Sequence, residues 1–392
     1  MTPDPPREQF GDHYRSIYLA GACGERPSLP VDWRGHEAAA AEALDERAAG
    51  YVFGSAGTGG TERANREALD AWRIVPRMLR DVAVRDLRTV PFGREWPAPL
   101  ALAPVGAQMI VHPDGELASA AGAERVGVPV TVGTVSGHTI EAVAEAIGDS
   151  PRMFQLYWPN DPELCESFVS RAEAAGYEAI MVTVDNAFPG WKPRDLQNAY
   201  LPAIEGIGLA NFFSDPVFRD GLEQPPEDDP GPAIGKFIGA FGNPSLTWDD
   251  LEWLRSRTSV PILLKGILHP DDAREARERG VEGVVVSNHG GRQVDGAIAA
   301  FEALPDVSAA VGDDLTVLFD SGIRSGADAF KALALGADAV LLGRPYLWGM
   351  ALEGSDGVEK VLRWTLAELD LTLGLSGFTS PAALDPTVLE PV

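Results

Sequence analysis

Short runs of aliphatic and β-branched residues recur along most of the chain, each closed by turn-forming residues and followed by a helix-like stretch. They occupy residues 99–105 (PLALAPV), 128–133 (VPVTVG), 153–158 (MFQLYW), 179–185 (AIMVTVD), 261–266 (PILLKG), 283–288 (GVVVSN), 315–321 (LTVLFDS) and 337–343 (ADAVLLG). Apolar runs of this length are typical of strands that are covered on both faces. Because eight β/α units close a parallel barrel, the pattern predicts an α/β protein with a (β/α)8 TIM barrel.

The segments between these runs are rich in Ala, Glu and Arg, and predict the helices that cover the barrel. Examples are residues 118–125 and 271–279. Before the first strand, residues 36–50 (HEAAAAEALDERAAG) predict one helix with Gly50 near its end. We therefore expect an N-terminal helical extension over residues 1–90, packed on a barrel that spans residues 91–392.

A long insertion separates the fourth and fifth predicted strands, over residues 189–249. Its middle, residues 224–232 (QPPEDDPGP), is rich in Pro and acidic residues, which predicts a mobile segment. The aromatic stretches 211–218 and 237–241 predict instead that the rest of the insertion packs as a lid.

Charge and composition narrow the classes of partner. The chain has 392 residues with 58 acidic and 32 basic side chains, a formal net charge of −26, which disfavours nucleic acid and anionic membranes as partners. The first eight residues (MTPDPPRE) lack the basic start and apolar run of a secretory signal, so we expect a cytoplasmic protein. Cys23 and Cys165 have no metal-ligand spacing, so we expect free thiols and no metal site.

Polar side chains follow several of the predicted strands, at the end of the barrel where active sites of this fold lie. The most specific group is residues 287–293 (SNHGGRQ), which places His289 and Arg292 three residues apart in a Gly-rich loop. An imidazole there can take a proton near neutral pH, and a nearby guanidinium can hold a carboxylate in a bidentate grip.

A second group of polar residues follows the last two predicted strands, in residues 320–326 (DSGIRSG) and 343–345 (GRP). Small residues let backbone N–H groups approach a phosphate there and arginines supply charge, so a phosphate-bearing ligand is predicted. Lys265 ends an apolar strand, and a buried cation needs an anionic partner. That partner is either a carboxylate of the barrel or a ligand that gains negative charge during turnover.

Together these motifs resemble the FMN-dependent α-hydroxy-acid oxidases and dehydrogenases, and the resemblance runs from about Tyr51 to near the C-terminus. Residues 288–293, 320–337 and 343–345 are similar to hallmark segments of that family. Residues 61–65 (TERAN), 154–157 (FQLY), 190–195 (GWKPRD) and the long insertion are most similar to its lactate 2-monooxygenase branch.

The resemblance implies FMN as the cofactor, an L-α-hydroxy acid such as lactate as the substrate, O2 as the acceptor, and a homo-oligomer (tetramer or octamer). It implies that His289 is the catalytic base, oriented by Asp185. Substrate contacts are implied for Tyr51, Tyr157, Arg194 and Arg292. Cofactor contacts are implied for Pro104, Val105, Gly106, Gln155, Thr183, Lys265, Asp320, Gly322, Arg324, Gly343 and Arg344.

The fate of the keto acid is a separate question. The resemblance to the lactate 2-monooxygenase branch, including Gly106 where related oxidases tend to carry Ala, implies a coupled oxidative decarboxylation of lactate to acetate, CO2 and water. The small Gly106 would leave space beside the flavin for the oxygen species. Gly133 and Val135 depart from residues common in the family, Ser and a large aromatic respectively. Alternatives are a simple oxidase that releases keto acid and H2O2, a dehydrogenase with another acceptor, a nucleotide dehydrogenase with a loop cysteine, and a non-catalytic flavin binder.

Overall fold

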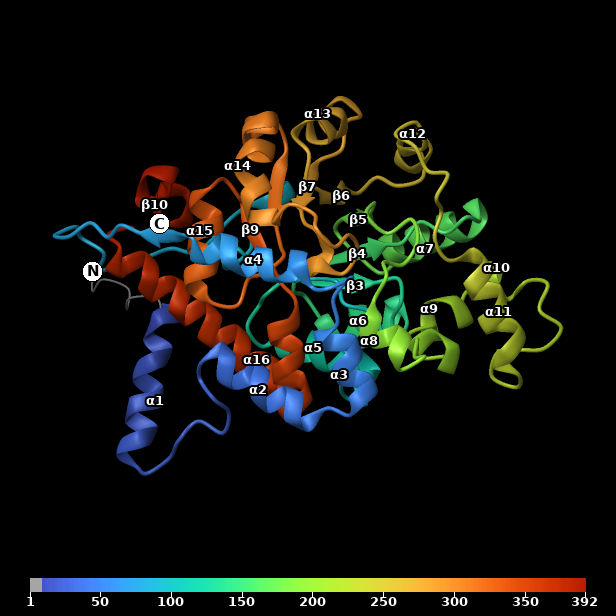
Figure 1. Cartoon of the computed structure of the whole chain (residues 1–392), viewed down its shortest axis with the longest axis horizontal. Coiled ribbons are helices and arrows are strands. Elements are labelled where there is room, and N and C mark those ends of the chain that lie inside the picture. The colour runs from blue at the N-terminus through green and yellow to red at the C-terminus, as the bar shows by residue number, and fades with distance from the viewer. Residues whose placement is uncertain (1–8) are drawn as a thin grey trace, which may run out of the picture.

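A closed barrel of parallel strands forms the centre of the molecule (Figure 1). The computed structural model describes residues 9–392, and the eight residues on which the prediction of no secretory signal falls lie outside them. Within residues 9–392 the barrel strands are β2 (Leu100–Leu102), β3 (Val130–Gly133), β4 (Arg152–Leu156), β5 (Ile180–Thr183), β6 (Ile262–Ile267), β7 (Gly283–Val286), β8 (Thr316–Phe319) and β9 (Ala339–Leu342). Each overlaps one of the predicted runs, so the predicted TIM barrel is confirmed.

The alternation of side chains along the strands determines what reaches the mouth of the barrel. Met181 and Leu263 are buried in the barrel interior. Because side chains two residues apart share a face of a strand, Thr183 and Lys265 continue the same inward rows toward the carboxyl ends. The strand register places these two residues side by side. Polar residues at this end therefore converge on the barrel mouth.

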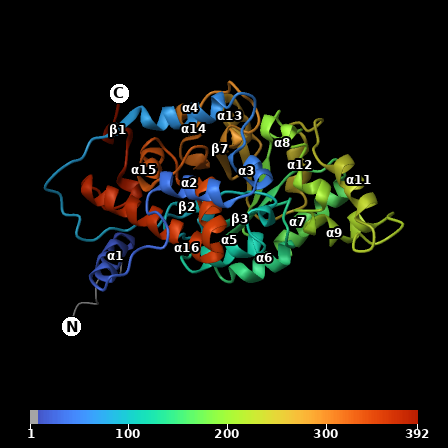
Figure 2. The ribbon, with the colours of Figure 1, turned by 60° about the horizontal axis from the view of Figure 1, so that its bottom comes forward.

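Helices cover the outside of the barrel (Figures 1 and 2). They are α5 (Gly115–Glu124), α6 (Ile140–Ile147), α7 (Pro162–Ala174), α12 (Asp250–Arg255), α13 (Pro270–Glu278), α14 (Ala300–Val311), α15 (Gly326–Ala334) and α16 (Arg344–Leu375), the last kinked at Gly354. The predicted covering helices around residues 118–125 and 271–279 correspond to α5 and α13. No helix within residues 9–392 is long and apolar enough to cross a membrane.

The N-terminal part consists of α1 (His13–Ala22), α2 (Trp33–Ala43), α3 (Glu46–Phe53) and α4 (Gly60–Asp70), and β1 (Trp72–Ile74) pairs antiparallel with β10 (Leu389–Pro391). The prediction of a single helix over residues 36–50 is wrong, because the helical conformation is interrupted between α2, which ends at Ala43, and α3, which begins at Glu46. Asp45 caps α3 by accepting a hydrogen bond from the N–H of Ala48 at 2.8 Å. Gly50 lies inside α3, and α3 runs on to Phe53, with Gly54 at its C-cap.

The insertion is helical and lies at the end of the molecule opposite both termini (Figures 1 and 2). It contains α8 (Pro193–Gln197), α9 (Ala210–Phe213), α10 (Pro216–Arg219) and α11 (Pro230–Ala240). The Phe212 ring packs edge-on against Phe168 of α7, Phe218 and Phe237, with ring centroids 4.9–5.4 Å apart. The predicted aromatic packing is therefore present, while the mobility of residues 224–232 stays a prediction.

Candidate active site

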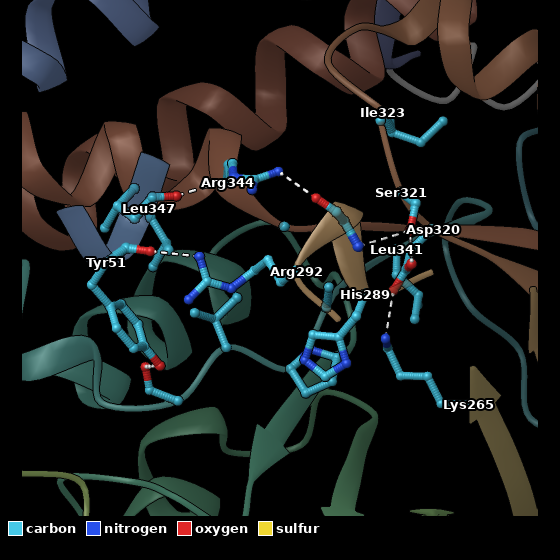
Figure 3. A pocket seen from close by; sticks show the side chains of 18 of the residues that line it. Tyr51, Lys265, His289, Arg292, Asp320, Ser321, Ile323, Leu341, Arg344 and Leu347 are labelled. Atoms are coloured by element: carbon cyan, nitrogen blue, oxygen red, sulfur yellow. Dashed lines mark hydrogen bonds and ion pairs between the residues drawn. The ribbon is translucent and has the colours of Figure 1, made fainter. Parts of the chain in front are cut away.

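A pocket opens at the carboxyl ends of the barrel strands (Figure 3). Its lining includes most of the residues that the sequence singled out: Tyr51, Pro104, Val105, Gly106, Tyr157, Lys265, His289, Arg292, Asp320, Gly322, Arg324, Gly343 and Arg344. Figure 3 shows Tyr51 and Arg292 on one side of His289, and Lys265 with Asp320 on the other. Side chains that lie more than 200 residues apart in the sequence thus converge on one imidazole.

His289 and Asp185 form the central pair of this pocket. The Nδ1 atom of His289 lies 2.9 Å from Oδ1 of Asp185, and Nε2 lies 3.4 Å from the hydroxyl oxygen of Tyr157. Burial raises the pKa of the Asp185 carboxyl, but the charges of His289 and Lys265 and the hydrogen bond from His289 outweigh burial, so its pKa lies below the ordinary value. Asp185 is therefore an anion that fixes the ring with Nε2 toward Tyr157.

The backbone at His289 is unusual for a residue with a side chain, since its φ is +60°. Two serine hydroxyls hold this conformation: Ser287 Oγ accepts from the N–H of His289 at 3.0 Å, and Ser321 Oγ accepts from the N–H of Gly290 at 3.0 Å. Ser321 itself has a φ of +82°. Left-handed backbone at non-glycine residues persists only when its surroundings impose it, and clusters at functional sites. Sequence reasoning did not give either serine a role, because a hydroxyl beside a strand end carries no specific signal.

Lys265 is buried and has a carboxylate partner within the barrel. Its Nζ lies 3.1 Å from Oδ2 of Asp320 and donates to Ser287 Oγ at 2.9 Å. Ser321 donates to the other carboxylate oxygen of Asp320 at 2.8 Å. The barrel carboxylate that the sequence left open as one option is therefore present, and it holds the ammonium at the mouth of the barrel.

The C-terminal end of α3 receives two arginines. Arg292 donates from Nη1 to the carbonyl oxygens of Tyr51 and Gly54, both at 2.7 Å. Arg344 donates from Nε to Val52 and from Nη2 to Gly54, and Nη2 also pairs with Glu62 at 3.2 Å. Unpaired carbonyls at a helix C-terminus carry partial negative charge and stabilise cations. The N-terminal extension thus builds one wall of the pocket.

Both tyrosine hydroxyls of the pocket are held in the protonated form. Burial raises the pKa of Tyr51 and of Tyr157 above the ordinary value, and for Tyr157 the charge of Asp185 adds to that effect. Tyr51 donates to the carbonyl oxygen of Gly106 at 3.3 Å, and its ring lies beneath the Arg292 guanidinium. Each tyrosine is therefore a hydrogen-bond donor beside a cation.

Arg324 provides the test of whether an anionic group fits this pocket. Its side chain is buried, and no acid within residues 9–392 lies at ion-pair distance from it. Burial and the like charges of Arg344 and Arg66 lower the pKa of Arg324 to about 9. Arg324 donates from Nη1 to the carbonyl oxygen of Ile323 at 3.0 Å. A buried cation without an anionic partner is costly, so the site is incomplete without an anion. The Cβ of an alanine at Gly343 would have only the Ala103 methyl within 4 Å, which leaves the backbone there open to approach. These residues fit the phosphate of the predicted FMN.

Gln155 and Thr183, also predicted to contact the cofactor, lie beside the pocket at the ends of β4 and β5. Gln155 Nε2 donates to Thr183 Oγ1 at 2.9 Å, so the two side chains are joined by a hydrogen bond. The interpretation of Gly106 changes with the structure. A Cβ at Gly106 would lie 2.8 Å from the carbonyl oxygen of Val135, so the close approach of the loop after β3 explains the glycine. The glycine at position 106 therefore does not by itself indicate free space beside the flavin.

Arg194 is the predicted site residue that the structure does not bring to the pocket. It is exposed on α8 and lines a separate surface depression with Glu46 and Gly50. Lys192, which is the N-cap residue of α8, is half-buried, and its charge interacts with that of Arg292. Burial and the charge of Arg292 lower the pKa of Lys192 to about 8, whereas Asp195 opposes that shift. Sequence reasoning missed Lys192 because it lies two residues before Arg194 in the same motif, and the motif alone does not distinguish between the two cations.

Comparison with known proteins agrees with this geometry. Residues 40–391 match the model of the FMN-dependent dehydrogenase family. The chain is 45% identical over 384 residues to an FMN-dependent alpha-hydroxy acid dehydrogenase of Schizosaccharomyces pombe, covering 95% of this chain and 94% of that one. It is 43% identical over 352 residues to an L-lactate oxidase of Lysinibacillus sphaericus, covering 90% of each. A crystal structure of mandelate oxidase superposes with a TM-score of 0.82 at 39% identity, covering 93% of this chain and 98% of that one. The chain therefore belongs to the FMN-dependent α-hydroxy-acid dehydrogenases and oxidases, and FMN is its cofactor.

Proposed function

We propose that this chain oxidises an L-α-hydroxy acid, with lactate as the first candidate, to the α-keto acid, and that O2 is the final acceptor. The observation that carries the proposal is the 2.9 Å contact of His289 with Asp185 in a pocket that also holds Arg292, Tyr51 and Tyr157. Such a pocket offers a base, an anion that orients it, and donors for a carboxylate substrate.

His289 acts as the base in this proposal. Its Nε2 faces the pocket beside Tyr157, while Nδ1 is engaged by Asp185, so Nε2 is the atom that accepts the proton leaving the substrate. Asp185 stabilises the imidazolium that results, because it is a buried anion in contact with the ring. When bound, FMN supplies the two-electron acceptor for this oxidation.

The substrate carboxylate is bound by Arg292 with help from Lys192. Arg292 uses Nη1 for the α3 carbonyls, which leaves its Nε and Nη2 for a bidentate contact. Lys192 adds a second cation from the root of the insertion, and Tyr51 and Tyr157 add hydroxyl donors. Arg324 and Arg344 bind the FMN phosphate, and Lys265 supplies a buried positive charge toward the cofactor.

We further propose that lactate is converted with O2 to acetate, CO2 and water, as in a lactate 2-monooxygenase. This outcome requires pyruvate and peroxide to react before either is released, and so requires a covered pocket. The insertion supplies a cover, since Phe241 packs edge-on against Tyr157 with centroids 5.3 Å apart, and Leu209 pairs with Ser136 in the loop after β3. Relatives named L-lactate oxidase support lactate as the substrate.

The visible spectrum of the purified holoenzyme, recorded without oxygen before and after addition of lactate, tests the oxidation. Bleaching of the flavin bands by lactate is the expected result. A yellow protein that no α-hydroxy acid bleaches would be a flavin binder, and would overturn the proposal.

Product analysis tests the fate of the keto acid, with lactate in air and without catalase. Acetate formed in step with O2 consumption, without free peroxide, is expected for the coupled reaction. Pyruvate and H2O2 in equal amounts would show a simple oxidase, and would leave the first proposal intact while removing the second.

A further inference from the structure

We propose that Gln293 is a positioning residue that fixes Asp185 against His289 and fastens the root of the insertion to the same point. The proposal rests on the proposed role of His289 as the base. Gln293 follows Arg292 in the loop after β7, and its side chain crosses to the loop after β5, in residues 185–190.

Both the N–H groups and the oxygen of the Gln293 side-chain amide form hydrogen bonds to the loop after β5. Its Nε2 donates to the carbonyl oxygen of Asp185 at 2.7 Å, to Oδ1 of Asn186 at 2.9 Å and to the carbonyl oxygen of Phe188 at 3.3 Å. Its Oε1 accepts from the N–H of Gly190 at 3.2 Å. A side-chain amide has two N–H groups and one carbonyl to offer, so the loop after β5 takes all of them.

Asp185 depends on this support because its carboxylate is held on one side alone. Oδ1 contacts His289, whereas Oδ2 is buried and has no hydrogen-bond partner within residues 9–392. No second side-chain contact therefore sets the angle of the carboxylate, and the backbone of residue 185 must set it. Gln293 holds the carbonyl of that backbone, and Gly266 packs so closely that an added Cβ would lie 2.6 Å from the Cβ of Asp185.

The same contacts reach the insertion and the tyrosine next to the base. At Gly190 an added Cβ would lie 2.6 Å from the carbonyl oxygens of Arg292 and Gln293, so the insertion leaves the barrel through a tight seam. Asn186, which Gln293 holds, lines the same cavity as Tyr157, and Tyr157 lies beside His289. Displacement of the insertion at this seam is thereby transmitted to both neighbours of the imidazole.

Two variants separate positioning from mere support of the fold. Gln293→Met keeps the length of the side chain and removes both donors and acceptor, whereas Gln293→Glu keeps the acceptor for Gly190 and removes the donors to Asp185 and Asn186. Gln197→Met is the matched control, because Gln197 is an exposed glutamine on α8.

Three measurements on the FMN-loaded proteins follow. They are the proton NMR resonance of the His289 Nδ1–H group, the limiting rate of anaerobic flavin reduction by lactate with its apparent Kd, and amide hydrogen exchange over residues 186–200. The Nδ1–H resonance is assigned by its loss in Asp185→Asn, and it reports on the pair independently of activity.

In both Gln293 variants we expect the Nδ1–H resonance to move upfield or vanish, and the limiting rate to fall about 10- to 100-fold, because small misplacements in a catalytic site cost that much. The apparent Kd for lactate and the FMN content stay near wild type. Amide exchange over residues 186–200 rises in Gln293→Met, and Gln197→Met changes none of these quantities.

A wild-type Nδ1–H resonance together with an unchanged limiting rate would overturn the proposal. If Gln293→Met does not fold, Gln293→Glu decides by the same resonance and rate. If no α-hydroxy acid reduces the wild-type flavin, the proposed function fails, and the resonance and the exchange pattern still decide whether Gln293 holds the pair.

Discussion

Arg292 and Arg344 donate hydrogen bonds to the same atom, the carbonyl oxygen of Gly54, at 2.7 and 3.1 Å. Arg292 comes from the loop after β7, and Arg344 is the first residue of α16, which follows β9. The shared acceptor is at the C-terminal end of α3. The partial negative charge at this helix end lets two guanidinium groups lie side by side. One helix end outside the barrel therefore positions both the arginine proposed to bind the substrate and one of those proposed to bind the phosphate.

Replacement of Arg292 by Lys removes the bidentate contact while keeping a positive charge. We expect kcat/KM for lactate to fall about 10- to 100-fold, because a charge-assisted hydrogen bond contributes about 1.5–3 kcal/mol. The FMN content measured from the visible spectrum is expected to stay unchanged. Wild-type kcat/KM in this variant would remove Arg292 from the substrate clamp.

Lys192 predicts a pH dependence of substrate binding. Its pKa of about 8 means that the ammonium loses its proton, and hence its attraction for a carboxylate, as the pH rises through that value. The KM for lactate in steady-state assays is therefore expected to rise above pH 8. Lys192→Arg keeps its charge, so its KM stays level over the same range. A KM that rises equally in both proteins would exclude Lys192 as the cause.

Arg194 offers a direct comparison with Lys192. Because Arg194 is exposed on α8, whereas Lys192 is half-buried and interacts with Arg292, Lys192→Met is expected to raise KM, and Arg194→Met is expected to leave it near wild type. Steady-state kinetics of the two variants measure this difference. The reverse order would restore Arg194 to the carboxylate clamp, as the sequence motif suggested.

Removal of the base is expected to stop chemistry and spare the cofactor. In His289→Ala the rate of anaerobic flavin reduction should fall about 100- to 10,000-fold, which is the usual contribution of a general base. Arg324 and Arg344, which are predicted to bind phosphate, are unchanged in this variant, so it should retain FMN. Stopped-flow reduction at a near wild-type rate would show that another group takes the proton.

Arg324→Met tests the phosphate site through two opposite effects. Without FMN, the variant loses a buried cation that has no acidic partner, so its Tm is expected to equal or exceed that of the apo wild type. Its affinity for FMN is expected to fall about 10- to 100-fold, from loss of a charge-assisted contact of about 1.5–3 kcal/mol. A lower apo Tm with unchanged FMN affinity would make Arg324 a structural residue only.

The barrel and the centre of the site could be predicted because their signals are local. Each predicted strand is a short apolar run between turn residues, and each observed barrel strand overlaps one of these runs. His289 and Arg292 share one Gly-rich loop, and Lys265 and Asp320 each end a strand, so barrel geometry alone brings them to one mouth.

Other features depended on contacts between distant segments, which no local pattern carries. The capping carboxylate of Asp45 divides one predicted helix into two, although the Ala-rich run would support a single helix. The approach of Val135 explains Gly106, which the sequence had suggested was a gap beside the flavin.

The sequence by itself determined the strand order, the family and most of the pocket lining, because periodicity and motif spacing are properties of neighbouring residues. Tertiary structure decided how the two cations of the 190–195 motif are placed, because Arg194 is exposed on α8, whereas Lys192 at the start of this helix is half-buried and interacts with Arg292. It also decided that Ser321 and Gln293 join the loop after β7 to the loops after β8 and β5, since each does so through a hydrogen bond between different strands, and hydrogen-bond geometry exists only once the strands are closed into a barrel.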